Sequence, residues 1–156
     1  VLPSAQFPWE ISRGYKVNEG PEWLAGPNGH NFIVYSANFS AETKYCLGMF
    51  TLNPGNDPMN PQNWTRNPVP VFFSDETNHP GNLYGTGHNC FIKVKNKNYI
   101  VYHATHNTGS QYTVDGIPKR FVMAQEFVFD QSGIPVFGGS LFKPGTSFDT
   151  GPIPQM

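Results

Sequence analysis

The sequence has few charged residues and no cluster of one sign. Only 13% of its 156 residues are Asp, Glu, Lys or Arg, and the formal net charge is −1. Without a run of Lys or Arg, there is no electrostatic basis for binding nucleic acid or an anionic membrane surface. No apolar stretch approaches the roughly 20 residues that cross a bilayer as a helix. We therefore expect no nucleic-acid partner and no membrane partner.

Helical periodicity and cysteine are scarce as well. No segment places apolar residues at helical spacing over about ten positions, which argues against a helical fold. The only cysteines are Cys46 and Cys90. They could pair, but each lies in an apolar, strand-like run, which favours two buried free thiols. The chain starts at Val1 with no signal-like segment before it, and we interpret it as processed or incomplete.

Aromatic residues and turn formers are abundant instead. Aromatics make up 15% of the chain, with 16 Gly and 15 Pro. Such a composition is typical of a turn-rich β-protein that is secreted and handles sugars. Two glycosylation sequons, at Asn38 and Asn63, lie on predicted surface connections and agree with a secreted, extracellular glycoprotein.

Strand-like runs dominate the chain. Each is rich in β-branched and aromatic residues and is bounded by Gly, Pro or Asn. The clearest runs cover residues 31–37, 44–52, 69–73, 90–94, 98–104 and 121–130. The sequence therefore predicts an all-β fold.

Two of these runs resemble each other. "HNFIVYSA" and "KNYIVYHA" align at an offset of 67 residues, and each continues into a third strand and a short fourth. A repeat of four antiparallel strands is the pattern of a propeller blade. We predict that residues 1–16 end one blade, 17–85 form the next, and 86–156 form another. All belong to the C-terminal portion of a single propeller domain.

The chain is too short to close such a propeller. Four strands with their connections need roughly 45 residues, so even about four blades require roughly 180 residues. Two blades alone would leave bare inner strands and edges. We expect this partial propeller to be completed by N-terminal blades, present as a second chain, or to self-associate.

Glu19 and His88 are the candidate catalytic pair. Glu19 opens the first strand of one predicted blade, and the repeat places His88 at nearly the same position in the next. First strands line the axis of a propeller, so both side chains should face one cavity. Aromatic walls would favour the neutral form of a carboxyl group, as a general acid requires. The alternatives are a solvated turn residue for Glu19 and a structural hydrogen-bonding residue for His88.

Several motifs are similar to those of glycoside hydrolase family 43. "VNEGPEWL", "FIVYSAN", "YCLGMFTL", "YGTGHNCF", "IVYHA" and "AQEFVFDQSGIPVFG" occur in family order and cover nearly the whole chain. They resemble the C-terminal half of the catalytic domain in its secreted α-L-arabinofuranosidase-like members. The resemblance implies a five-bladed β-propeller. It also implies that Glu19 is the general acid, that His88 helps to hold a calcium ion through water, and that Arg120 faces the sugar.

Two further residues are candidates for substrate binding. Gln125 lies in the "AQ" segment that follows Arg120. Trp9 could stack on a sugar ring, although core packing explains a tryptophan equally well. Many relatives carry a basic residue where Met123 stands, which weakens the case for substrate contact there. The polar loop 103–116 is either a substrate-contacting rim or a plain surface loop.

The resemblance implies hydrolysis with inversion. One carboxylic acid protonates the leaving oxygen while a carboxylate about 6.5–9.5 Å away activates water. The base belongs to blades that this sequence does not contain. Seven acidic residues of this sequence were considered for the role of base, and none lies in a base motif of the family: Glu10, Glu22, Asp57, Asp75, Glu76, Asp115 and Glu126.

The function expected from these features is hydrolysis of α-L-arabinofuranosyl or β-xylosyl linkages in plant cell-wall polysaccharide. We expect the chain to be inactive without its missing blades. The alternatives are a non-catalytic, lectin-like propeller fragment and a degradation product.

Overall fold

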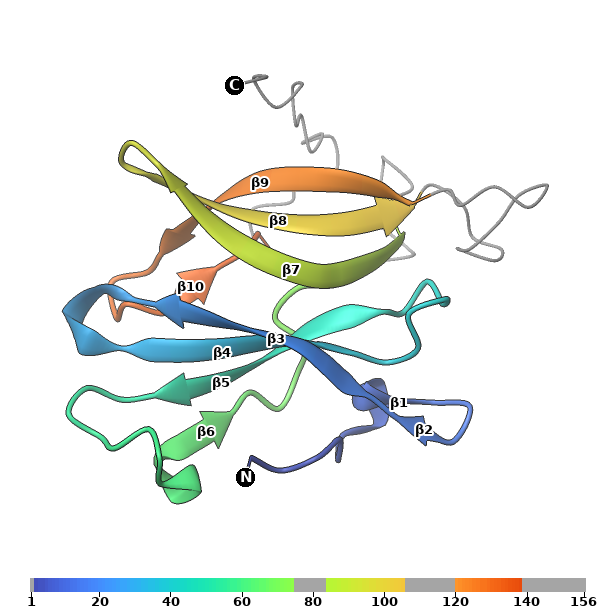
Figure 1. The fold of residues 1–156 in the computed structure, drawn as a ribbon, viewed down its shortest axis with the longest axis horizontal. Coiled ribbons are helices and arrows are strands. Elements are labelled where there is room, and N and C mark those ends of the chain that lie inside the picture. Colours follow the sequence, from blue (N-terminus) through green and yellow to red (C-terminus); the bar gives the residue numbers. More distant parts are fainter. Residues whose placement is uncertain (1, 75–83, 106–119, 139–156) are drawn as a thin grey trace.

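Two four-stranded antiparallel sheets make up most of the molecule. The computed structural model describes residues 2–74, 84–105 and 120–138, and Figure 1 shows the sheets one above the other. The strand order is β3-β4-β5-β6 in the first sheet and β10-β9-β8-β7 in the second, with a separate β1-β2 hairpin. Each sheet is a meander of neighbouring strands, which confirms the prediction of an all-β chain built from four-stranded units.

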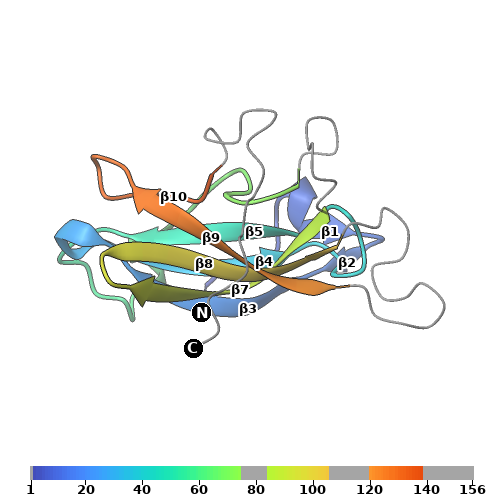
Figure 2. The same cartoon turned by 90° about the horizontal axis from the view of Figure 1, so that it is seen from above.

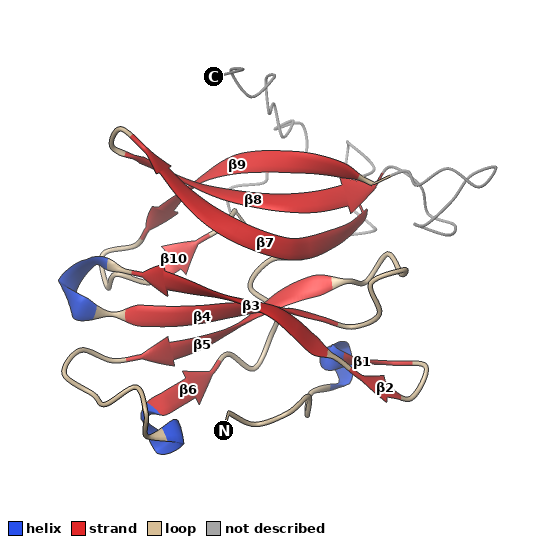
Figure 3. Cartoon of the chain, viewed as in Figure 1, coloured by secondary structure: helices blue, strands red, loops and turns tan. Residues whose placement is uncertain are grey.

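The strands of the first sheet and of the hairpin are β1 Ile11–Ser12, β2 Tyr15–Lys16, β3 Asn18–Ala25, β4 Asn31–Ala37, β5 Cys46–Leu52 and β6 Trp64–Arg66. Those of the second sheet are β7 Tyr84–Val94, β8 Lys97–Thr105, β9 Phe121–Phe129 and β10 Pro135–Val136. Helical structure in the described residues is limited to three single 3₁₀ turns, η1 Pro8–Glu10, η2 Pro27–Gly29 and η3 Pro61–Asn63 (Figure 3).

One predicted strand was wrong. We expected residues 69–73 to be the fourth strand of the first sheet, but that strand is β6, Trp64–Arg66. Residues 69–73 contribute only an isolated bridge between Phe72 and Leu47. Pro68 and Pro70 lack the N–H group that a continuous ladder requires, so pairing stops between β6 and the bridge.

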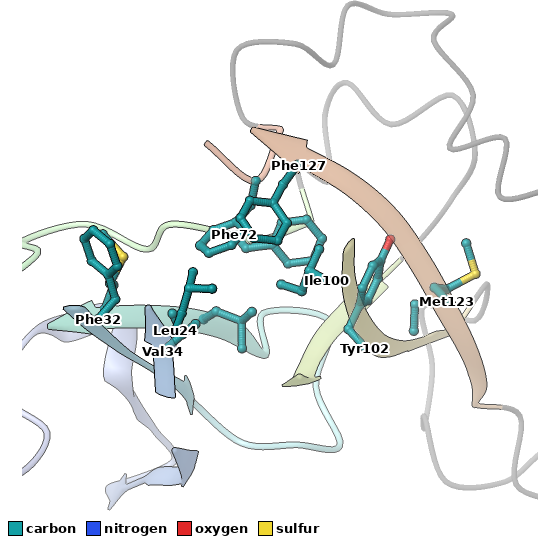
Figure 4. Close-up of a cluster of buried hydrophobic side chains, with 12 residues drawn as sticks. Leu24, Phe32, Val34, Phe72, Ile100, Tyr102, Met123 and Phe127 are labelled. Carbon is teal, nitrogen blue, oxygen red and sulfur yellow. The ribbon is translucent and has the colours of Figure 1, made fainter. Parts of the chain in front are cut away.

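The core lies between the two sheets. Leu24 and Val34 of the first sheet meet Ile100 and Phe127 of the second in one buried cluster (Figure 4). Phe72 completes the cluster, with its ring edge-on to Tyr102 at 4.8 Å between ring centroids. The bridge segment that failed to form a strand therefore acts as a packing element between the sheets.

The predicted 67-residue repeat relates equivalent strands. β4 and β8 are each the second strand of their sheet. Tyr35 and Tyr102, separated by that offset, are both buried, with 3% and 2% of their surface exposed. The unit bounds 1–16, 17–85 and 86–156 stay a prediction, because residues 75–83 and 139–156 lie outside the described residues.

A buried carboxylate attaches the N-terminal segment to the first sheet. Glu10 has no exposed surface, and its Oε2 accepts from the backbone N–H groups of Gln6 at 2.7 Å and Phe7 at 2.8 Å. Its Oε1 accepts from the Tyr35 hydroxyl at 2.7 Å, and the Arg66 Nη1 pairs with Oε2 at 3.1 Å. These bonds compensate for burying the charge, so Glu10 is an anchoring group of the fold.

The two cysteines are free and differ in environment. Cys46 is buried, whereas Cys90 is exposed, so the expectation of two buried thiols was right for Cys46 only. Burial raises the pKa of Cys46 to about 12, and burial together with Glu22 raises that of Cys90.

We expect one thiol to react quickly in the native chain. Because a thiol reacts as its thiolate and must be reached by the reagent, Cys90 should be modified first and Cys46 only after unfolding. Titration with a chromogenic disulfide reagent, with and without denaturant, measures both classes. Equal rates for the two thiols in the native state would contradict the burial of Cys46, and a Cys90→Ser variant identifies the fast class.

Candidate active site

Glu19 lies at a bulge near the start of β3. The pairing of β3 with β4 shifts register between Glu19 and Glu22, and Gly20 between them has a φ of +53°. A bulge re-aims the neighbouring side chains, and glycine adopts a positive φ without steric cost. In this orientation the Glu19 Oε1 accepts a hydrogen bond from the Tyr45 hydroxyl at 2.7 Å.

His88 lies at the corresponding part of β7. That strand shifts register on both sides of Gly87, and His88 has a φ of +54°, a value that non-glycine residues rarely adopt. Its backbone N–H donates to the Ser36 Oγ at 2.7 Å, and Ser36 is the cross-strand partner of Glu19. A Cβ atom at Gly20 would lie 3.7 Å from the His88 Nδ1. The structure therefore brings the start of β3 close to His88, and the expectation that the side chains of Glu19 and His88 face one cavity stays a prediction.

Arg120 contacts His103, whose ring stacks on Tyr45. Its Nη1 lies 3.4 Å from the His103 Nε2, and its Nη2 donates to the Ser40 carbonyl at 2.7 Å. Burial, with the positive charge of Arg120, lowers the pKa of His103 to about 4. His103 is therefore neutral near pH 7, and its Nε2 accepts because a guanidinium can only donate.

Tyr45 joins the acid to the second sheet. Its ring is stacked on His103, with 5.5 Å between centroids and 2° between planes, and it also occupies the space that a side chain at Gly87 would need. Burial raises the pKa of Tyr45 well above its usual range, and the carboxyl of Glu19 raises it further, so its hydroxyl stays protonated and donates.

A pocket of about 500 Å³ adjoins Glu19. Its polar lining includes Lys16, Asn18 and Glu19, and its apolar lining includes Tyr35 and Phe50. The rest of its wall comes from Leu2, Pro3, Ser4, Ala5, Pro21 and Ile33. Glu19 thus borders an open, partly apolar volume, while its carboxyl group bonds to Tyr45, which stacks on His103 of the second sheet.

Two other predicted binding residues make structural contacts instead. The Trp9 Nε1 donates to the Pro68 carbonyl at 2.9 Å, and its ring packs against the buried group around Tyr35. The Gln125 Nε2 donates to the Phe137 carbonyl at 2.5 Å. Neither residue contacts the Glu19–Tyr45–His103 group in the described structure, and sugar contacts by Trp9 and Gln125 stay predictions.

The sequon asparagines differ in exposure. Asn38 is only 5% exposed, with a φ of +74°, and its Nδ2 donates to the Trp9 carbonyl at 3.1 Å. Asn63 is half-buried, and its Nδ2 donates to the Asp57 carbonyl at 3.0 Å. Asn63 is therefore the more accessible of the two, and glycosylation at either stays a prediction.

His88 does not complete a calcium site with the residues described. No group of three or more His, Cys, Asp or Glu side chains that could hold a metal ion occurs in 2–74, 84–105 and 120–138. Calcium takes about six to eight oxygen ligands. The adjacent residue Asn89 is 4% exposed, and its side-chain amide makes no hydrogen bond. Calcium near His88 stays a proposal, and no chemical step below depends on it.

Sequence reasoning missed Tyr45, and it considered His103 only as the first residue of the polar loop 103–116, whereas the structure places residues 103–105 in β8. Both stand inside motifs singled out for their strand pattern, "YCLGMFTL" and "IVYHA". The sequence does hold a signal for them: each side chain ends in a polar group on a strand predicted to be buried, and buried hydroxyl and imidazole groups need hydrogen-bond partners. Asp75, Glu76, Asp115 and the loop 103–116 beyond Thr105 lie outside the described residues.

Known proteins are similar to this chain in sequence and in fold. The chain is 44% identical over 105 residues to an extracellular exo-alpha-(1->5)-L-arabinofuranosidase of Streptomyces chartreusis, covering 66% of the chain and 30% of that protein. It is 34% identical to alpha-L-arabinofuranosidase B of Pyricularia oryzae, covering 88% of the chain and 28% of that protein. The crystal structure of an alpha-L-arabinofuranosidase from Lactobacillus brevis superposes with a TM-score of 0.76 at 32% identity, covering 88% of the chain and 41% of that structure.

The two four-stranded sheets match part of a β-propeller. The structural relatives are five-bladed propellers, which confirms the predicted fold class. The sequence profile of Glycosyl hydrolases family 43 matches residues 3–135, and the chain belongs to that family. It spans less than a third of the length of the curated relatives named above. Among the residues described, no helix is long and apolar enough to span a bilayer.

Proposed function

We propose that this chain supplies the general acid of an inverting α-L-arabinofuranosidase, and that the acid is Glu19. The observation that carries the proposal is the Glu19 carboxyl group, fixed by the Tyr45 hydroxyl at 2.7 Å, in a residue that borders a pocket of about 500 Å³. A carboxyl group whose orientation is fixed can protonate the oxygen of a glycoside bound within its reach. Family membership supports the same role.

The proposed reaction is a single displacement at the anomeric carbon. Glu19 gives its proton to the glycosidic oxygen, the bond between that oxygen and the anomeric carbon breaks, and the electron pair stays on the leaving oxygen. Water adds to the opposite face of the sugar and loses its proton to a second carboxylate about 6.5–9.5 Å from the acid. That base is proposed to lie in blades outside this sequence.

The proposed substrate is an arabinofuranosyl linkage in plant cell-wall polysaccharide, with β-xylosyl linkages as the second choice. The names of the curated relatives support the arabinofuranosyl linkage and an extracellular location. Arg120 is proposed to face the sugar and His88 to contribute to a water-mediated calcium site. Neither role is needed for the proton transfer.

The outer face of the second sheet supports completion by further blades. Apolar side chains on β7 and β9 stay 45–67% exposed: Ile92, Val94, Val122 and Val128. Exposed apolar side chains on two strands of one sheet are available for contact with another element. We propose that the missing N-terminal blades, on the same or a separate polypeptide, complete the propeller.

We expect hydrolysis only from the completed propeller. The chain alone, and the chain joined to or mixed with the missing blades, are incubated with an arabino-oligosaccharide, and the anomer released first is identified by proton NMR. The proposal predicts inverted product from the completed form and none from the chain alone. Product with retained configuration would contradict the mechanism. Binding without hydrolysis in the completed form would favour a lectin-like function.

A further inference from the structure

The hydrogen bond between Tyr45 and Glu19 distinguishes the two carboxyl oxygens. The Tyr45 hydroxyl donates to Oε1 at 2.7 Å, while Oε2 makes no hydrogen bond to any described residue. We propose that Tyr45 is a positioning residue, which holds Oε1 as the acceptor and so leaves the proton of the acid on Oε2. This inference rests on the proposed function, because it assigns the oxygen from which Glu19 protonates the substrate.

A neutral carboxyl group carries one acceptor oxygen and one O–H group. The carbonyl oxygen of a neutral carboxyl group is a stronger acceptor than its O–H oxygen, so with Tyr45 donating to Oε1 the proton is favoured on Oε2. The carboxyl group is also prevented from rotating about its last side-chain torsion, which is otherwise broad. Tyr45 thus fixes both the site and the direction of proton donation without touching the substrate.

The second sheet keeps Tyr45 in this position. Its ring lies against Gly87, where a Cβ atom would collide with the ring carbons, and it stacks on the imidazole of His103. His103 is in turn contacted by Arg120 and lies 6.2 Å from the ring of His88. Tyr45 immediately precedes β5 of the first sheet, to which Glu19 also belongs, and the groups that orient it come from β7, β8 and the residue before β9. One sheet carries the acid and its neighbour orients it.

The test compares two leaving groups in the completed propeller. Protonation by the acid matters for an alkoxide leaving group, as in an arabino-oligosaccharide, and matters little for a dinitrophenyl arabinofuranoside, whose leaving group departs as a stable anion. Tyr45→Phe keeps the stacked ring and removes the hydroxyl. We expect kcat on the oligosaccharide to fall about tenfold with KM unchanged, the size expected for one lost hydrogen bond. On the aryl substrate we expect little change.

The controls separate this inference from the proposed function. Tyr99→Phe removes a hydroxyl from the opposite end of β8 and should leave both rates unchanged, and thermal unfolding of both variants checks the fold. Equal losses on the two substrates, or no loss on either, would overturn the positioning role. Glu19→Gln is measured in parallel. If Glu19→Gln loses no activity, the proposed function is wrong; if only Glu19→Gln shows the leaving-group effect, the inference on Tyr45 fails and the proposed function stands.

Discussion

Replacing Glu19 with Gln is expected to lower kcat on an arabino-oligosaccharide by about 10²–10⁴-fold in the completed propeller. Glutamine has nearly the same shape, and its amide oxygen can still accept from the Tyr45 hydroxyl, so the bulge in β3 should persist. What the variant lacks is a proton that can be transferred to the leaving oxygen. Initial rates at saturating substrate measure the loss directly.

The matched control is Glu22→Gln. Glu22 lies in the same strand, is also partly buried, and pairs with Val34 of β4 at the other side of the bulge. We expect its kcat to stay close to that of the unmodified protein. A loss of similar size at both positions would mean that either substitution disturbs β3, and the assignment of Glu19 as the acid would lose its support.

Replacing Arg66 with Met is expected to cost the fold about 3–5 kcal/mol. Arg66 and Glu10 pair at 3.1 Å with 8% and 0% of their side chains exposed. The guanidinium also donates to the carbonyl groups of Pro3 and Ser4, and its carbon lies 4.7 Å from the centroid of the Phe50 ring. Methionine could fill much of the volume but would leave a carboxylate buried without its cation. Urea unfolding followed by tryptophan fluorescence measures the change.

A surface ion pair provides the control for Arg66. Lys97 and Glu126 lie closer, at 2.7 Å, but their side chains are 61% and 43% exposed. Because exposed pairs are screened by water, Lys97→Met should hardly change the urea midpoint. If Arg66→Met yields no folded protein while Lys97→Met does, that result also supports the anchoring role of Glu10. Equal small effects of both substitutions would refute the anchoring role of Glu10.

The strands were predictable because their sequence pattern is local. Runs such as 31–37 and 121–130 combine β-branched and aromatic residues between turn formers, and they correspond closely to β4 and β9. The run 69–73 has the same apolar character, but its proline interrupts the ladder, so it packs between the sheets instead. The apolar character of this segment predicted a strand and could not predict where its hydrogen bonding stops, and only Phe72 of the segment is buried.

The proximity of Glu19 and His88 was predictable from the repeat, whereas their surroundings were not. Tyr45 and Glu19 are 26 residues apart, and Glu10 and Arg66 are 56 apart. Partners so distant along the chain are set by the tertiary arrangement of the strands and the N-terminal segment, which a single sequence does not specify. From the sequence, Glu10 was considered only as a possible base. Its full burial was not expected, because an acidic residue is almost never fully buried unless it is paired.

The leaving-group dependence of Glu19→Gln tests the central claim most directly. Rates of the completed propeller and of this variant are compared on an arabino-oligosaccharide and on dinitrophenyl arabinofuranoside. If Glu19 donates the proton, the variant should be severely impaired on the oligosaccharide and nearly as fast as the unmodified protein on the aryl substrate. Equal impairment on both substrates, or full activity on the oligosaccharide, would contradict the account.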